Sequence, residues 1–109
     1  MSSDLDLLVE ERLKLVAEFS YYKYSHDLPI EDRSVEYQLE DHFLLECTGY
    51  GVSLERARCF LQEHFKASKS LQKELYRKYE SGERPEVKYS LEEYRIILRE
   101  KLFAMASFL

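Results

Sequence analysis

The chain has 109 residues, 45% of them hydrophobic, and its 21 acidic and 16 basic residues give a net charge of −5. This length predicts a single domain over residues 1–109, and the hydrophobic content excludes a disordered chain. The charges are interspersed without a basic block, which argues against a nucleic-acid partner. No apolar run approaches the roughly 18 residues that a membrane span needs, so we expect no membrane segment.

The first residues are acidic and lack the basic start of a secretory signal. The sequence as given therefore predicts a cytoplasmic protein, or an exported one if a signal peptide has been removed. The two cysteines, Cys47 and Cys59, are too few for a disulfide scaffold, and two free thiols are the expectation, with a bridge or a reactive cysteine as the alternatives. The three histidines form no ligand motif, and His64, on an apolar helix face, is expected in the core rather than at a metal.

Four helices are expected to account for nearly the whole chain, at about residues 4–25, 32–48, 54–80 and from 90 onward. The segment "HDLPIED" interrupts the first helix, and the glycines of "GYGVS" end the second. Ser53 is the predicted N-cap of the third helix, and "SLEE" predicts a capping box from Ser90 to Glu93. No segment shows convincing strand alternation. The fold class expected is therefore all-α, a small helical bundle.

The first predicted helix carries two cations in the middle of its apolar stripe. At 100° per residue, Arg12 and Lys23 point along the centre of the stripe, whereas Glu18 is expected on the outer face with Glu10, Glu11 and Lys14. A cation inside a core must be paired, hydrated or neutralised. One answer is a buried anion that does not belong to the chain.

The same projection predicts inward-facing polar side chains on every helix. Seven are expected to converge: Arg12, Lys23, Asp32, Glu36, Ser68, Gln72 and Arg95. They could be ordinary helix residues, with the cations reaching outward to water or Glu36 pairing with Lys23 inside the bundle. Buried ion pairs are poor stabilisers, however, and a polar cluster between helices is a usual way to build a ligand site.

In the segments around these residues, the chain resembles the all-helical chorismate mutases, most closely the exported, gamma-type subclass. The resemblance begins with "ERLKLVAEFSYYK", where a lysine follows the arginine by eleven residues, and continues through the "LPIEDRSVE" turn. It ends with "FLQEHFKASKSLQ", where a glutamine follows a serine by four residues. The three segments occur in family order over about residues 5–76, and the last helix matches more loosely.

The resemblance implies an isomerase of aromatic amino acid biosynthesis, the shikimate pathway, that rearranges chorismate to prephenate without a metal or a cofactor. It implies catalytic roles for Lys23 and Gln72, which would donate hydrogen bonds to the ether oxygen of chorismate. Glu36 would join them by holding the ring hydroxyl, together with Asp32.

Three further residues would bind the substrate. The resemblance implies that Arg12 and Ser68 contact carboxylates of chorismate. Arg95 stands where the exported subclass brings an arginine from a later helix of the same chain.

The chain also departs from the family pattern. Many relatives place an arginine three residues after the turn aspartate, where this chain has Val35. An arginine that the intracellular subclass draws from a partner's helix has no counterpart before Arg12, and the chain is shorter than most exported members. Four alternatives therefore stay open: weak activity of the chain on its own, a partner enzyme that completes the site, a non-catalytic binding module, and elimination of pyruvate from isochorismate. A homodimer also stays open.

Overall fold

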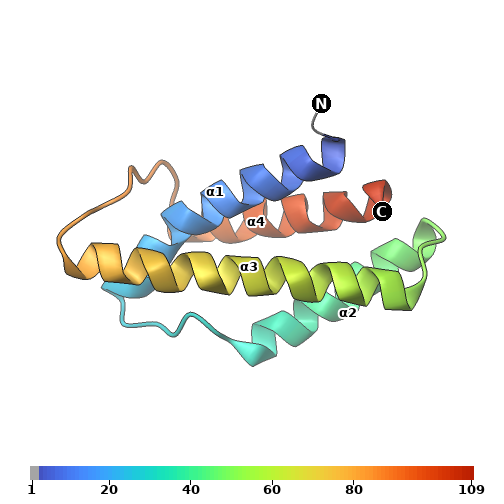
Figure 1. Ribbon diagram of the computed structural model, residues 1–109, viewed down its shortest axis with the longest axis horizontal. Helices are drawn as coiled ribbons and strands as arrows, with labels where there is room; N and C mark the ends of the chain where they lie inside the picture. Colours follow the sequence, from blue (N-terminus) through green and yellow to red (C-terminus); the bar gives the residue numbers. More distant parts are fainter. Residues whose placement is uncertain (1–2) are drawn as a thin grey trace.

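The computed structural model describes residues 3–109, which form four α-helices (Figure 1). The helices are α1 (Asp4–Ser25), α2 (Arg33–Gly49), α3 (Leu54–Glu80) and α4 (Leu91–Met105), and a short 3-10 turn, η1 (Ala106–Phe108), follows the last. The described residues contain no strand, so the expected all-α bundle is confirmed. No helix in this range is both long and apolar enough to cross a membrane.

Each α-helix begins after a short polar residue that caps it. The caps are Ser3, Asp32, Ser53 and Ser90. In each case the side-chain oxygen accepts a hydrogen bond from the backbone N–H three residues later, and such a cap typically stabilises a helix by about 1 kcal/mol. The predicted caps at Ser53 and Ser90 are therefore confirmed, and Asp32 lies just before α2 rather than in it.

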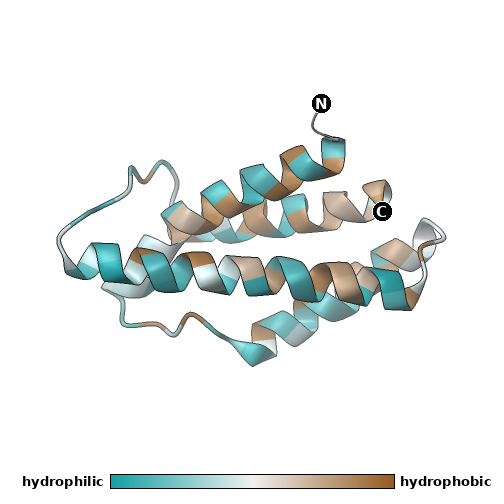
Figure 2. Cartoon of the chain, viewed as in Figure 1, coloured by the Kyte–Doolittle hydropathy of each residue, from teal (hydrophilic) through white to brown (hydrophobic). Residues whose placement is uncertain are grey.

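The helices are arranged so that all four face a common interior. α1 packs against α3 and α4, and α2 packs against the same two helices. In Figure 1, α1 and α3 run in the same direction, while α4 runs back beside α1. Figure 2 shows hydrophilic and hydrophobic residues alternating along each ribbon, as expected for helices with one face turned inward. Side chains from every helix can therefore meet in the middle.

The larger apolar core lies where the α2–α3 connection and the end of α4 come together. Its buried members are Phe43, Cys47, Ala57, Leu61, Leu102, Met105 and Ala106. A smaller cluster of Val16, Tyr94 and Leu98 joins α1 to α4. Cys47 is buried and Cys59 exposed, both as free thiols.

The prediction that Glu18 lies on the solvated face of α1 is wrong. Its side chain is only 8% exposed, and Oε1 accepts a hydrogen bond of 2.7 Å from the hydroxyl of Tyr94. The same hydroxyl accepts a bond of 3.0 Å from the backbone N–H of Lys88. The start of α4 and the segment before it therefore cover a face of α1 that helical periodicity alone assigns to water.

Candidate functional site

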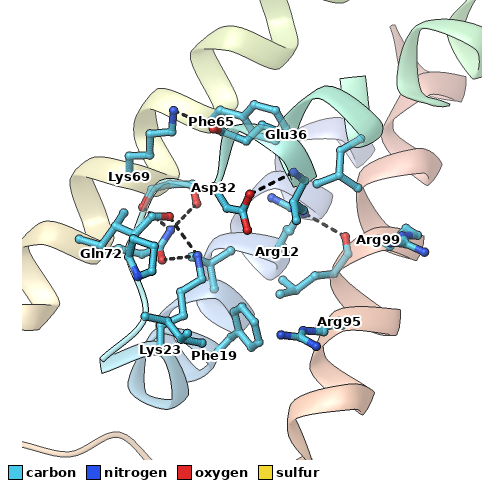
Figure 3. A pocket seen from close by; sticks show the side chains of 18 residues that line it. Arg12, Phe19, Lys23, Asp32, Glu36, Phe65, Lys69, Gln72, Arg95 and Arg99 are labelled. Atoms are coloured by element: carbon cyan, nitrogen blue, oxygen red, sulfur yellow. Dashed lines mark hydrogen bonds and ion pairs between the residues drawn. The ribbon is translucent and has the colours of Figure 1, made fainter. Parts of the chain in front are cut away.

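A cavity of about 480 Å³ lies between the four helices and the segment that joins α1 to α2 (Figure 3). All seven polar residues expected to converge line it: Arg12, Lys23, Asp32, Glu36, Ser68, Gln72 and Arg95. Apolar side chains of both cores complete its wall, among them Val16, Leu39 and Leu98. The structure thus brings the predicted residues into one pocket.

Arg12 is the most deeply buried cation of the pocket, with 6% of its surface exposed. Its Nε donates to the carbonyl of Leu98 at 2.9 Å, and Nη1 lies 3.0 Å from Nε2 of His64. Among residues 3–109, no carboxylate forms an ion pair with it. Burial lowers the pKa of Arg12 to about 10, so the guanidinium stays charged at neutral pH.

Lys23 reaches the pocket from the last turns of α1. Its Nζ donates to the carbonyl of Ile30 at 3.1 Å and to Oε1 of Gln72 at 3.2 Å, and it lies 5.6 Å from the ring centre of Phe19. An ammonium has three donors, so one N–H remains for a ligand. Burial lowers the pKa of Lys23, while the charges of Asp32 and Glu36 act in the opposite direction.

Gln72 and Ser68 form a buried polar pair on α3. The amide Nε2 of Gln72 lies 3.3 Å from the carbonyl of Ser68 and 3.2 Å from its hydroxyl, and donates toward both. Because the ammonium of Lys23 can only donate, it sets the orientation of the amide, with Oε1 toward Lys23 and Nε2 toward Ser68. The donor group of Gln72 is therefore held by its own helix.

The two carboxylates of the pocket are already engaged. Oδ1 of Asp32 caps α2 by accepting from the N–H of Val35 at 3.2 Å. Glu36 forms an ion pair of 2.7 Å with Lys69, so the alternative in which Glu36 pairs with Lys23 is wrong. Lys69 also contacts Glu31 at 3.0 Å.

Two arginines stand at the exposed part of the pocket on α4 (Figure 3). Arg95 was expected there, whereas Arg99, one helical turn later, was not. Residues four apart lie on the same helix face, so this spacing could have identified Arg99. The sequence reasoning also does not identify Lys69 in the wall of the pocket, or His64, which contacts Arg12 from behind the pocket. Nothing local signals Lys69, and the apolar face of His64 indicates burial but not contact with Arg12.

The charge of the pocket is opposite to that of the whole chain. Five cations and two carboxylates line it, although the chain has a net charge of −5. The cations that line it are Arg12, Lys23, Lys69, Arg95 and Arg99. A concave site with positive walls and apolar patches favours a small anionic ligand with a hydrophobic part. This lining is the basis for inferring a function, since comparisons with protein-family models, curated proteins and solved structures found no match.

Proposed function

We propose that the pocket binds chorismate, a small dicarboxylate, and rearranges it to prephenate. The observation that carries the proposal is the pair formed by Arg12 and Lys23. Both cations line the cavity, both keep unused N–H groups, and neither forms an ion pair with a carboxylate of residues 3–109. Placing unpaired cations against an apolar interior is unfavourable unless an anion joins them.

The size and the walls of the cavity support a ligand of this class. A volume of about 480 Å³ lies within the range of roughly 300–1,000 Å³ typical of small-molecule sites. Val16, Phe19 and Leu98 offer apolar surface to a ring, while the polar groups lie around them. One carboxylate of the ligand would meet Arg12 inside the bundle, and the other would meet Arg95 and Arg99 near the solvent.

The reaction requires little covalent chemistry from the protein. Within one molecule a C–O bond breaks as a C–C bond forms, so the first requirement is to hold the substrate in a compact conformer. Negative charge develops on the ether oxygen as the C–O bond breaks. The free N–H of Lys23 would stabilise that charge from a fixed position, and more strongly in the transition state than in the bound substrate.

A second candidate function is binding without catalysis, and the contacts of Gln72 favour it. Its Nε2 donates to Ser68 rather than into open space. For Gln72 to serve as a second donor to the ether oxygen, the amide must exchange Ser68 for the substrate. A module that only binds the dicarboxylate, alone or with a partner enzyme, requires no such exchange.

The experiment that separates these functions follows the loss of chorismate by absorbance and measures chorismate binding by calorimetry. The proposal expects turnover by the purified chain, and a decrease of roughly 100-fold or more in kcat for Lys23→Ala, as is typical when one preorganised donor is lost. Lys66→Ala, an exposed residue of the same helix as Gln72, is the matched control and should behave like the parent.

Each alternative has its own outcome. Binding without turnover, also when a candidate partner enzyme is added, would indicate the binding module. Release of pyruvate from isochorismate, with chorismate left intact, would indicate the lyase reaction. Turnover of chorismate by Lys23→Ala at the parent's rate would refute the catalytic role of Lys23.

A further inference from the structure

His64 is a buried ionisable side chain behind the pocket that the proposed reaction does not use. It lies on α3, is 4% exposed and does not line the cavity. Its ring stacks parallel to that of Phe60, with ring centres 6.2 Å apart, and its Nε2 lies 3.0 Å from Nη1 of Arg12. The residue thus contacts the deepest cation of the site from outside the site.

The chemistry of this contact determines the state of the imidazole. A guanidinium nitrogen can only donate a hydrogen bond, so Nε2 of His64 must accept. Only the neutral ring with its hydrogen on Nδ1 offers that acceptor. Burial, and secondarily the charge of Arg12, lower the pKa of His64 to about 4, in agreement with a neutral ring at pH 7.

A neutral histidine with this tautomer is not the best residue for packing alone. Its Nδ1 is buried and has no hydrogen-bond partner among residues 3–109. A buried donor without a partner is destabilising, whereas an apolar side chain of similar size would not incur this penalty. The hydrogen bond that Nε2 accepts from Arg12 therefore explains a histidine at this position better than core packing does.

Arg12 is held at two points from two different helices. The Leu98 carbonyl of α4 accepts from Nε, and His64 of α3 accepts from Nη1. Two contacts at separate nitrogens fix the plane of the guanidinium. Three of its five N–H bonds, on Nη1 and Nη2, remain for a ligand. An arginine fixed in this way can meet a planar carboxylate through two parallel hydrogen bonds without first losing side-chain freedom.

We propose that His64 is a positioning residue that orients Arg12 through its neutral Nε2, so that the guanidinium presents its remaining N–H bonds to a carboxylate of the ligand. The proposal rests on the proposed function only in that Arg12 binds a carboxylate, and it holds for a catalyst and for a binding module alike. It predicts that the acceptor at Nε2, rather than the volume of the ring, is what the site needs.

Two variants separate the acceptor from the volume. His64→Gln keeps an acceptor oxygen at about the reach of Nε2, while His64→Leu keeps apolar volume and has no acceptor. His42→Leu, at an exposed histidine that packs edge-on against Phe103, is the matched control. Thermal unfolding of all three variants shows whether each is folded before any other property is compared.

The first measurement needs no ligand. Nitrogen-15 NMR of the parent at pH 7 should show His64 with hydrogen on Nδ1 only, and separate, slowly exchanging Nη–H signals for Arg12. The Arg12 signals should stay separate in His64→Gln and average in His64→Leu. A His64 with hydrogen on Nε2, or signals that stay separate in His64→Leu, would overturn the proposal even if chorismate is never turned over.

The second measurement uses chorismate as the probe. We expect KM, or Kd where turnover is absent, to rise about tenfold in His64→Leu with little change in kcat, and to stay within about twofold of the parent in His64→Gln. Equal affinities in the two variants would overturn the proposal. If the parent binds no chorismate, the proposed function fails, and the NMR result alone then decides whether His64 orients Arg12.

Discussion

The two ends of the bundle are built from the same helices, yet their inward positions hold opposite kinds of side chain. At the end that contains the α2–α3 connection, Phe43, Leu61 and Leu102 are at most 1% exposed and pack on one another. Around the pocket, inward positions of these helices hold charged and amide side chains such as Glu36 and Gln72. The comparison indicates that one end holds the helices together, which allows the other to carry polar groups.

The division between the ends is not complete. Glu18 and the hydroxyl of Tyr94 are buried beside the smaller apolar cluster, and neither lines the pocket. His64 is likewise buried between the large core and Arg12. Polar groups outside the pocket therefore influence either the stability of the fold or the geometry of the site. Substitutions of these residues show which of the two properties each group affects.

The largest effect is expected from the apolar end. Phe43→Ala removes a ring with no exposed surface, and such truncations typically lower the free energy of unfolding by about 3–5 kcal/mol. Chorismate binding, measured well below the melting temperature, should be unchanged. Urea unfolding provides the first value and calorimetry the second. Tyr37→Ala, 62% exposed on the same helix, is the control. A loss of affinity that matches the loss of stability would mean that the ends are not independent.

A pH titration tests the buried histidine between the ends. The pKa of His64 is about 4 in the folded protein and about 6.5 in the unfolded chain. Between these values the unfolded chain takes up a proton that the folded protein does not, so stability falls as the pH is lowered from 6.5 to 4. Carboxylates titrate in the parent and in His64→Gln alike, so the difference between the two proteins isolates the contribution of His64. The decrease in stability should be about 3 kcal/mol larger in the parent than in His64→Gln.

Urea unfolding at several pH values measures this difference. Gln62→Ala, which changes an exposed residue of the same helix that does not titrate, should follow the parent throughout. Parallel curves for the parent and His64→Gln would show that His64 titrates at its ordinary pKa when folded, and that burial near Arg12 does not keep the ring neutral.

Tyr94→Phe tests the polar contact at the smaller cluster. It removes the hydroxyl that bonds to Glu18 and to the N–H of Lys88, and leaves both groups without this partner. The free energy of unfolding should fall by about 1–3 kcal/mol, while KM for chorismate stays the same. Tyr89→Phe, at a partly exposed ring, should change stability by less than about 0.5 kcal/mol. A raised KM in Tyr94→Phe alone would place this contact with the site rather than with the scaffold.

The smallest effect is expected at the rim of the pocket. Arg99→Ala removes an exposed cation, so stability should change by less than about 0.5 kcal/mol. KM for chorismate should rise about fivefold, equivalent to about 1 kcal/mol, and the effect should shrink at high salt. Arg56→Ala, an exposed arginine outside the pocket, should leave KM unchanged. An unchanged KM in Arg99→Ala would exclude Arg99 from ligand binding.

Much of the fold follows from local signals in the sequence. Ser53 and Ser90 mark helix starts because a short polar side chain can satisfy a free N–H in the first turn. Gly51 follows α2 with a φ of 75°, a conformation that glycine adopts without strain. The inward placement of Arg12 and Gln72 follows from the period of the helix, since one face must turn toward the bundle.

The partners of these residues could not be found in the same way. The contact between Arg12 and His64 joins positions 52 residues apart, and that between Glu18 and Tyr94 joins positions 76 apart. Helical periodicity states which way a side chain points but not which element covers it. For this reason, periodicity predicts that Glu18 faces water and does not identify Lys69 as the partner of Glu36.

By itself, the sequence determined four helices, their ends and the residues on their inner faces, because caps, turns and periodicity are properties of neighbouring residues. Only the tertiary structure decided that Glu36 pairs with Lys69, that Gln72 donates to Ser68 and that His64 holds Arg12. The physical reason is that contacts between helices depend on how the helices cross and how far each is shifted along its neighbour. Packing of the whole chain sets these quantities, and no single helix contains them.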